Sequence, residues 1–217
     1  NGGIWPQGNI WYGLALLNNK QPDRSLKVLK KYLTLEGICN SPSGQPSFYE
    51  YRNADIHSQS YGQIDKPTFL WAGGLYLHYL YQLMGIQQSA FNLVLNSDIP
   101  ETFNNLEYPA FIRGRSCQFE WKGTGKYFSE ISWDGQSVNS AVLFRSVDKI
   151  SVVRGIPRQP YLAQINGILE QVIYDPAKQQ LRIQATAWSG HSLEIVIVAP
   201  IQLKKVLLNN EQRTDVH

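Results

Sequence analysis

The chain has 217 residues, of which 43% are apolar and 17% are charged. Such a chain can bury a core as one large domain or two small ones, and it is not a disordered tail. Its net charge of +3 comes from scattered basic residues, whereas a nucleic-acid surface needs a strong basic cluster. Its apolar runs are far shorter than a membrane span. We therefore expect no nucleic-acid partner and no membrane insertion.

The first hundred residues predict helices joined by polar loops. Residues 5–17 are apolar and nearly free of charge, which is typical of a helix buried on most sides. Residues 23–33 place leucines on one face and lysines on the other, as an amphipathic helix does. Residues 38–67 form a long polar loop, and long loops inside compact domains are commonly functional or disordered. Residues 68–84 predict a second apolar helix, which ends at Gly85. This order is typical of layered helical hairpins.

After residue 100 the pattern changes to short strands, with turn signals about every ten residues. The predicted strands are 110–113, 117–121, 128–133, 142–144, 150–153, 172–174, 181–185, 193–198 and 206–208. Asp134-Gly135 is a strong hairpin dipeptide. We therefore predict an α+β chain, with helices in residues 1–100 and an antiparallel β-sandwich in residues 101–217. The boundary is expected close to Pro100.

The long loop carries the strongest concentration of chemical groups. Glu50 lies among aromatic residues, beside Tyr49, Arg52 and Asn53. A carboxylate close to guanidinium and amide groups suits acid–base chemistry or sugar binding. Two plainer interpretations stay open: Glu50 is a solvated loop carboxylate, and Asp55 is a turn residue.

Two further segments lead into the apolar helices. Asn-Gly-Gly-Ile-Trp-Pro-Gln at residues 1–7 brings Trp5 and Gln7, and residues 69–74 bring Trp71. The first turn of a helix has free backbone N–H groups, so we expect a polar concavity at this end of the helices. Aromatic residues make up 12% of the chain. Core packing explains most of them, but aromatic rings also form the walls of sugar sites.

Other catalytic signatures are missing from the sequence. It has no Walker, dinucleotide-binding, nucleophile-elbow or zinc motif. Its four histidines lack metal-ligand spacing, and its two cysteines, Cys39 and Cys117, are too few for a disulfide scaffold or a thiolate site. We therefore expect no metal and no cofactor.

The three segments together resemble the six-hairpin glycosidases, whose catalytic domains are (α/α)6 toroids. Residues 1–6 are similar to a late barrel segment of that family. Glu50-Tyr51-Arg52-Asn53 keeps the Glu and Asn of the Glu-Asn-Tyr-Asn loop in glycoside hydrolase family 63, the glucosidase and mannosylglycerate hydrolase branch. Residues 69–73 resemble the helix start that follows this loop. The resemblance covers roughly residues 1–86, while the strand-rich half is similar to the family's C-terminal sandwich only in general pattern.

The resemblance implies an inverting glycoside hydrolase that acts on an oligosaccharide or a glycoside. Such enzymes use two carboxyl groups about 6.5–9.5 Å apart, one as acid and one as base. The family's base carries over to Glu50. Its acid, usually an Asp, lies upstream of the Asn-Gly-Gly segment and therefore outside this chain. The implied substrate-binding residues are Trp5, Gln7, Tyr49, Arg52, Asn53 and Trp71.

We therefore expect a C-terminal part of a larger protein, with about three of some twelve barrel helices. The only methionine is Met84 and the chain starts at Asn1, which also indicates processing or a fragment. The expected partners are a carbohydrate substrate and the upstream part of the same protein. Two alternatives stay open. One is a non-catalytic carbohydrate-binding or structural module. The other is a phosphorylase of the cellobiose or chitobiose kind, although Gln7 and Gly74 replace the His and Thr of those enzymes.

Overall fold

The computed structural model describes residues 3–34, 36, 48–88, 92–112, 114–209 and 211–213. It contains helices and many strands in several small sheets, so the α+β prediction is confirmed at this level. The chain divides into two compact units. The first unit comprises Asn1–Gln87 and Asp98–Thr102, and the second comprises Gln88–Ser97 and Phe103–His217. The chain therefore passes from one unit to the other three times.

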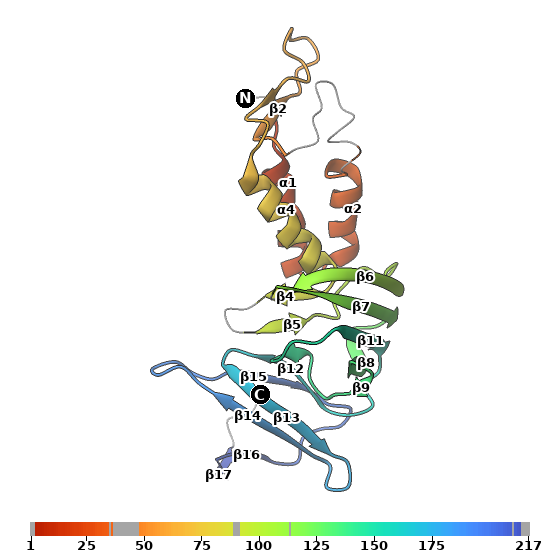
Figure 1. Cartoon of the computed structure of the whole chain (residues 1–217), viewed down its shortest axis with the longest axis vertical. Helices are drawn as coiled ribbons and strands as arrows, with labels where there is room; N and C mark the ends of the chain where they lie inside the picture. The colour runs from red at the N-terminus through yellow and green to blue at the C-terminus, as the bar shows by residue number, and fades with distance from the viewer. Residues whose placement is uncertain are drawn as a thin grey trace. The chain divides into compact units, whose positions relative to one another are not determined.

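The helices of the first unit begin and end where the sequence predicts, to within two residues. They are α1 (Pro6–Asn18), α2 (Pro22–Tyr32) and α4 (Leu70–Leu83), in the red-to-yellow part of Figure 1. Proline opens both α1 and α2, because a proline at the first helical position loses no hydrogen bond. After α4, Gly85 adopts a left-handed φ of 84°, which glycine tolerates and which ends the helix.

A buried polar network joins the three helices. The Ser25 hydroxyl of α2 donates to the Gly13 carbonyl of α1 at 2.9 Å, and the Tyr79 hydroxyl of α4 donates to the Ser25 carbonyl at 2.7 Å. Gly13 is required at this crossing, because an added Cβ would lie 2.5 Å from Cζ of Tyr79. Around the network is an apolar cluster made of Ile10, Leu16, Val28, Leu33, Tyr76 and Tyr79.

The prediction that α1 and α4 are buried on most sides is wrong for this structure. Trp11 of α1 is 51% exposed, and Leu70 and Trp71 of α4 are 87% and 53% exposed. Both helices are apolar all round, but α2 is the only other helix among the described residues of this unit. It shields one side only, and an apolar face of α1 and α4 is therefore open.

Strands also occur within the region predicted as helices and loops. The long loop contributes β2 (Tyr51–Asn53) and β3 (Ile64–Asp65), and β4 (Ile86–Gln88) and β5 (Leu93–Leu95) follow α4. Both β4 and β5 belong to a three-stranded sheet of order β10-β5-β4, with β10 at Val142–Leu143. The central β5 is buried along its length, which is why its sequence lacks the alternation of a half-exposed strand.

The largest sheet of the second unit has five strands in the order β6-β7-β11-β8-β9. Their bounds are β6 (Asn105–Ile112), β7 (Arg115–Gly123), β8 (Tyr127–Trp133), β9 (Gln136–Ser137) and β11 (Lys149–Gly155). The predicted pairing of β6 and β7 and the predicted turn after β8 are both confirmed. Asp134 and Gly135 in that turn have φ angles of 50° and 79°, as a type I′ hairpin needs.

This sheet is mixed, which corrects the prediction of purely antiparallel strands. β11 lies between β7 and β8 and runs parallel to β7 and antiparallel to β8. The connection from β7 to β8 therefore has to cross the position that β11 occupies. Gly123 and Gly125 allow this crossing: a Cβ on Gly123 would lie 2.6 Å from the Arg154 carbonyl oxygen, and one on Gly125 would lie 3.2 Å from the Gly155 backbone.

Three strand pairs complete the described part of the second unit. They are β12 (Tyr161–Ile165) with β15 (Ile195–Val198), β13 (Ile168–Asp175) with β14 (Gln180–Thr186), and β16 (Val206–Leu208) with β17 (Glu211–Arg213). The predicted hairpin over residues 172–185 is confirmed by β13 and β14. Buried side chains alternate along β7, β8 and β11, so one face of the five-stranded sheet carries a core with Phe119, Trp121 and Trp133.

A charged cluster occupies the other face of β7 and β11. Glu120 makes ion pairs with Lys122 and Lys149 and accepts a hydrogen bond from the Ser151 hydroxyl at 2.9 Å. These donors lower the pKa of Glu120 from its ordinary 4.5 to about 2, and the hydrogen bond from Lys122 has the largest effect. A lowered pKa stabilises the fold above pH 4.5, and this contribution is lost as the pH falls to about 2.

We expect Glu120→Gln to destabilise the protein by about 1 kcal/mol at pH 7, because exposed lysines and one hydroxyl contribute modestly. The difference in unfolding free energy between the variant and the wild type should shrink as the pH falls from 4.5 to 2. Urea unfolding of both proteins across that range measures it. Glu194→Gln is the control, because Glu194 is an exposed glutamate outside the Glu120 cluster. The prediction would be contradicted if Glu120→Gln lowered the free energy of unfolding no more than Glu194→Gln does.

Candidate functional site

The structure brings the three predicted segments together at one end of the first unit. β1 (Gly3–Ile4) pairs antiparallel with β2, so that Gly3 faces Asn53 and Ile4 faces Arg52. Phe48, at the start of the loop segment, accepts a hydrogen bond at its carbonyl from the amide of Phe69, which precedes α4, at 2.9 Å. The described part of the chain start, the Glu50 loop and the head of α4 are therefore neighbours. Asn1 and Gly2 lie outside the described residues.

Gly3 permits the close approach of the first two segments. A Cβ at this position would lie 2.8 Å from Cδ2 of Tyr51 and 3.3 Å from Nε1 of Trp5. The Trp5 and Tyr51 rings stack beside it, with centroids 5.3 Å apart and planes 25° apart. Trp5 therefore packs on the residue that follows Glu50.

Glu50 itself is a partly solvated, ion-paired carboxylate. Its backbone amide donates to the Asp65 carbonyl of β3 at 3.1 Å, and its Oε2 pairs with the Lys66 ammonium. The Glu50 side chain is 20% exposed. The hydrogen bond from Lys66 to Glu50 is the main reason that the pKa of Lys66 is raised. The carboxylate thus has a cationic partner and an open path to water.

Trp71 belongs to a separate aromatic group. Its ring makes edge contacts with Trp11 of α1 at 5.4 Å and with Phe69 at 5.8 Å between centroids. It is half exposed, so its ring can still be reached by a ligand. The described contacts therefore link Trp5 to β2, beside Glu50, and Trp71 to α1.

Three of the predicted substrate-binding residues are buried. Tyr49 and Arg52 pack together, with the guanidinium carbon 4.6 Å from the centre of the tyrosine ring. Burial raises the pKa of Tyr49, and the charge of Arg52 partly offsets this. Gln7 is also buried, and its side-chain oxygen has no hydrogen-bond partner among the described residues. In this structure the side chains of all three lie inside the first unit and not on its surface.

Asn53 shapes the loop that follows β2. Its Oδ1 accepts from the Asp55 amide at 2.9 Å, and its Nδ2 donates to the Ser60 hydroxyl at 2.6 Å. Asp55 in turn accepts from the His57 amide at 3.0 Å. Side-chain to backbone bonds of this kind define turns, so the interpretation of Asp55 as a turn residue is confirmed.

The cysteines offer no nucleophile in the described structure. Cys117 is a buried free thiol, and burial raises its pKa from 9.0 to about 11. It is therefore protonated and shielded at neutral pH. Cys39 lies outside the described residues. Among the described residues, no group of three or more His, Cys, Asp or Glu side chains could hold a metal ion.

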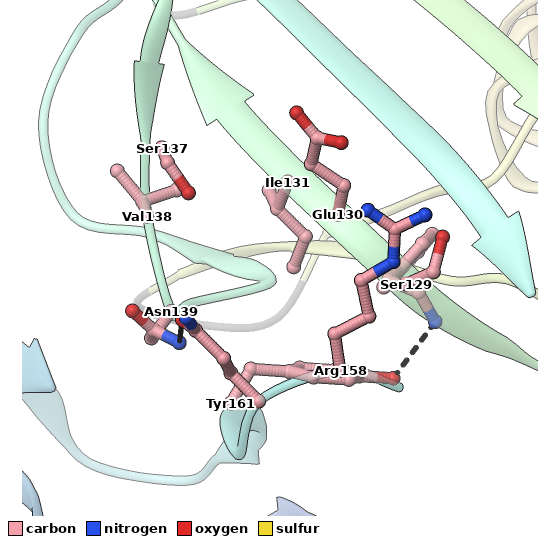
Figure 2. A pocket seen from close by; sticks show the side chains of 10 residues that line it. Ser129, Glu130, Ile131, Ser137, Val138, Asn139, Arg158 and Tyr161 are labelled. Atoms are coloured by element: carbon pink, nitrogen blue, oxygen red, sulfur yellow. Dashed lines mark hydrogen bonds between the residues drawn. The ribbon is translucent and has the colours of Figure 1, made fainter. Parts of the chain in front are cut away.

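A pocket in the second unit was not found by sequence reasoning. It is lined by side chains of β8, of the segment 137–139 and of the segment 158–161 (Figure 2). These residues form no motif, because three separate stretches supply them. The only hint in the sequence is a polar stretch between two predicted strands.

No family model matches the chain, and no curated protein matches it. None of the described helices combines the length and the apolar character needed to cross a membrane.

Proposed function

We propose that the chain is the C-terminal part of an inverting glycoside hydrolase of the six-hairpin kind, with Glu50 as the general base. One observation carries the proposal. The pairing of β1 with β2, together with the bond from Phe69 to Phe48, joins the three segments in which the chain resembles these enzymes. They are far apart in sequence, and a shared site requires them to be close.

The state of Glu50 suits this role. The base of an inverting enzyme is ionised and activates a water on the sugar face opposite the leaving group. A carboxylate that pairs with Lys66 and is 20% exposed can be charged and can hold a water. Trp5 and Trp71 would form sugar-stacking walls, while Tyr49 and Arg52 would hold the loop in shape. The general acid would come from an aspartate upstream of the Asn-Gly-Gly segment.

The open faces of α1 and α4 also support the proposal. Trp11, Tyr12, Leu70 and Leu77 form exposed apolar surface on two adjacent helices. Exposed apolar surface of this kind marks a surface that is covered by another element. In a toroid, the inner helices pack against neighbouring hairpins on both sides. Further hairpins of an (α/α)6 barrel would bury these side chains, and the second unit would be the sandwich that follows the barrel.

We expect residues 1–217 alone to leave aryl glycosides unhydrolysed. General acid and base groups each contribute about 10²- to 10⁴-fold, so a site without its acid should run close to the background rate. The protein expressed from its complete reading frame should hydrolyse a glycoside, and NMR of the fresh product should show the inverted anomer. Turnover by residues 1–217 alone, or a product with retained configuration, would contradict the assignment.

The second candidate is a non-catalytic carbohydrate-binding module. The Glu50–Lys66 ion pair favours it, because the ammonium occupies Oε2 and so leaves a base one carboxylate oxygen fewer to offer to water. If the complete protein bound a sugar but did not hydrolyse it, the binding-module candidate would be favoured. The phosphorylase alternative predicts turnover that depends on inorganic phosphate, which the same assay measures.

A further inference from the structure

The pocket in the second unit is a candidate binding site that involves none of the residues proposed around Glu50. Its volume is about 170 Å³. One side is formed by β8 with Ser129, Glu130 and Ile131, and Figure 2 shows Arg158 extending along this side. The segment after β9 forms the opposite side.

Hydrogen bonds fix the walls of this pocket. The Val138 amide donates to the Ile131 carbonyl at 2.9 Å, which holds the segment after β9 against β8. The Asn139 side chain donates to the Gln159 side-chain oxygen at 3.2 Å and to the Pro160 carbonyl at 2.9 Å. The concavity is therefore preorganised, which lowers the cost of binding.

The floor of the pocket is apolar and its rim is polar. Phe128, Ile131 and Tyr161 are buried beneath it, and the Tyr161 hydroxyl accepts from the Phe128 amide at 3.2 Å. Glu130 and Arg158 are exposed at the rim. Neither makes an ion pair with any described residue, so both charges are available to a ligand. An apolar floor with a few polar groups is the usual form of a small-molecule site.

We propose that this pocket binds a single neutral sugar residue. One water-sized position needs about 10–15 Å³, so the pocket has room for roughly a dozen such positions, which is close to the size of one hexose. The formal charges of Arg158 and Glu130 cancel, so neither an anion nor a cation is preferred. The guanidinium supplies paired donors and the carboxylate supplies paired acceptors, and adjacent hydroxyl groups of a sugar ring match both.

The test is an NMR titration of the ¹⁵N-labelled chain with D-glucose, D-galactose and D-mannose. D-Glucuronate and D-glucosamine serve as the anionic and cationic probes. We expect at least one neutral sugar to produce saturable shifts at the amides of Ile131, Val138 and Asn139. The dissociation constant should lie in the millimolar range, because the buried aromatic rings offer no open stacking face.

Two variants identify the site. Arg158→Gln and Glu130→Gln should each weaken binding by about tenfold, since each removes hydrogen bonds to a charged group. Arg115→Gln is the matched control, because Arg115 is an exposed arginine of β7 that does not line the pocket. Glu50→Gln should leave the shifts unchanged, which separates this site from the proposed catalytic one.

Several results would overturn the inference. They are an absence of saturable shifts with all three neutral sugars, equal binding by wild type and Arg158→Gln, and tighter binding of glucuronate or glucosamine than of any neutral sugar. If Glu50→Gln abolished the shifts, the sugar would be bound at the Glu50 site and not in this pocket.

Discussion

Glu50→Gln should lower kcat of the complete enzyme by about 10²-fold or more, with little change in KM. The amide keeps the size of the carboxylate and much of its hydrogen bonding, but it cannot take a proton from water. Steady-state kinetics on the natural glycoside measures the effect.

Asp65→Asn is the matched control for this change. Asp65 lies in β3, and its carbonyl accepts from the Glu50 amide, so the control removes a nearby negative charge and keeps the same sheet. It should retain most of the wild-type kcat. If Glu50 is a solvated loop carboxylate, the two variants should have the same kcat, and full activity of Glu50→Gln would exclude Glu50 as the base.

Gly13→Ala should destabilise the first unit by about 1–3 kcal/mol, because overpacking a closely packed site forces side chains or backbone to move. The added Cβ would lie 2.5 Å from Cζ and 2.6 Å from the hydroxyl oxygen of Tyr79. Tyr79 cannot move away cheaply, since it is fully buried and bonded to Ser25. Urea unfolding followed by far-UV circular dichroism reports on this unit, because all three described helices belong to it.

Gly8→Ala, on the same helix, provides the control. A Cβ there would meet only Cβ of Trp5, at an ordinary 3.7 Å. Alanine is the better helix former, so this change should be neutral or stabilise by up to about 1 kcal/mol. If Gly13→Ala were as stable as Gly8→Ala, the close crossing of α1 and α4 at Gly13 would be wrong.

Part of the candidate site was predictable from the sequence. The order of the three segments indicated that the chain start, the Glu50 loop and the head of α4 lie together, and the strand pairing agrees. Burial of Tyr49 and Arg52 was not predictable, because a loop has no periodicity that separates inward from outward side chains. The pairing of Glu50 with Lys66 was equally hidden, since 16 positions separate the two residues.

The sequence by itself determined the local elements. The two-faced pattern of α2, the prolines that open α1 and α2, and the Asp134-Gly135 turn depend on residues within one or two turns of the chain. Only the tertiary structure decided that β11 lies between β7 and β8, that Gly13 meets Tyr79, and that three separate stretches form the pocket around Arg158. These features depend on which distant segments pack together. That choice is made by the burial and close packing of side chains across the whole unit, and no local pattern encodes it.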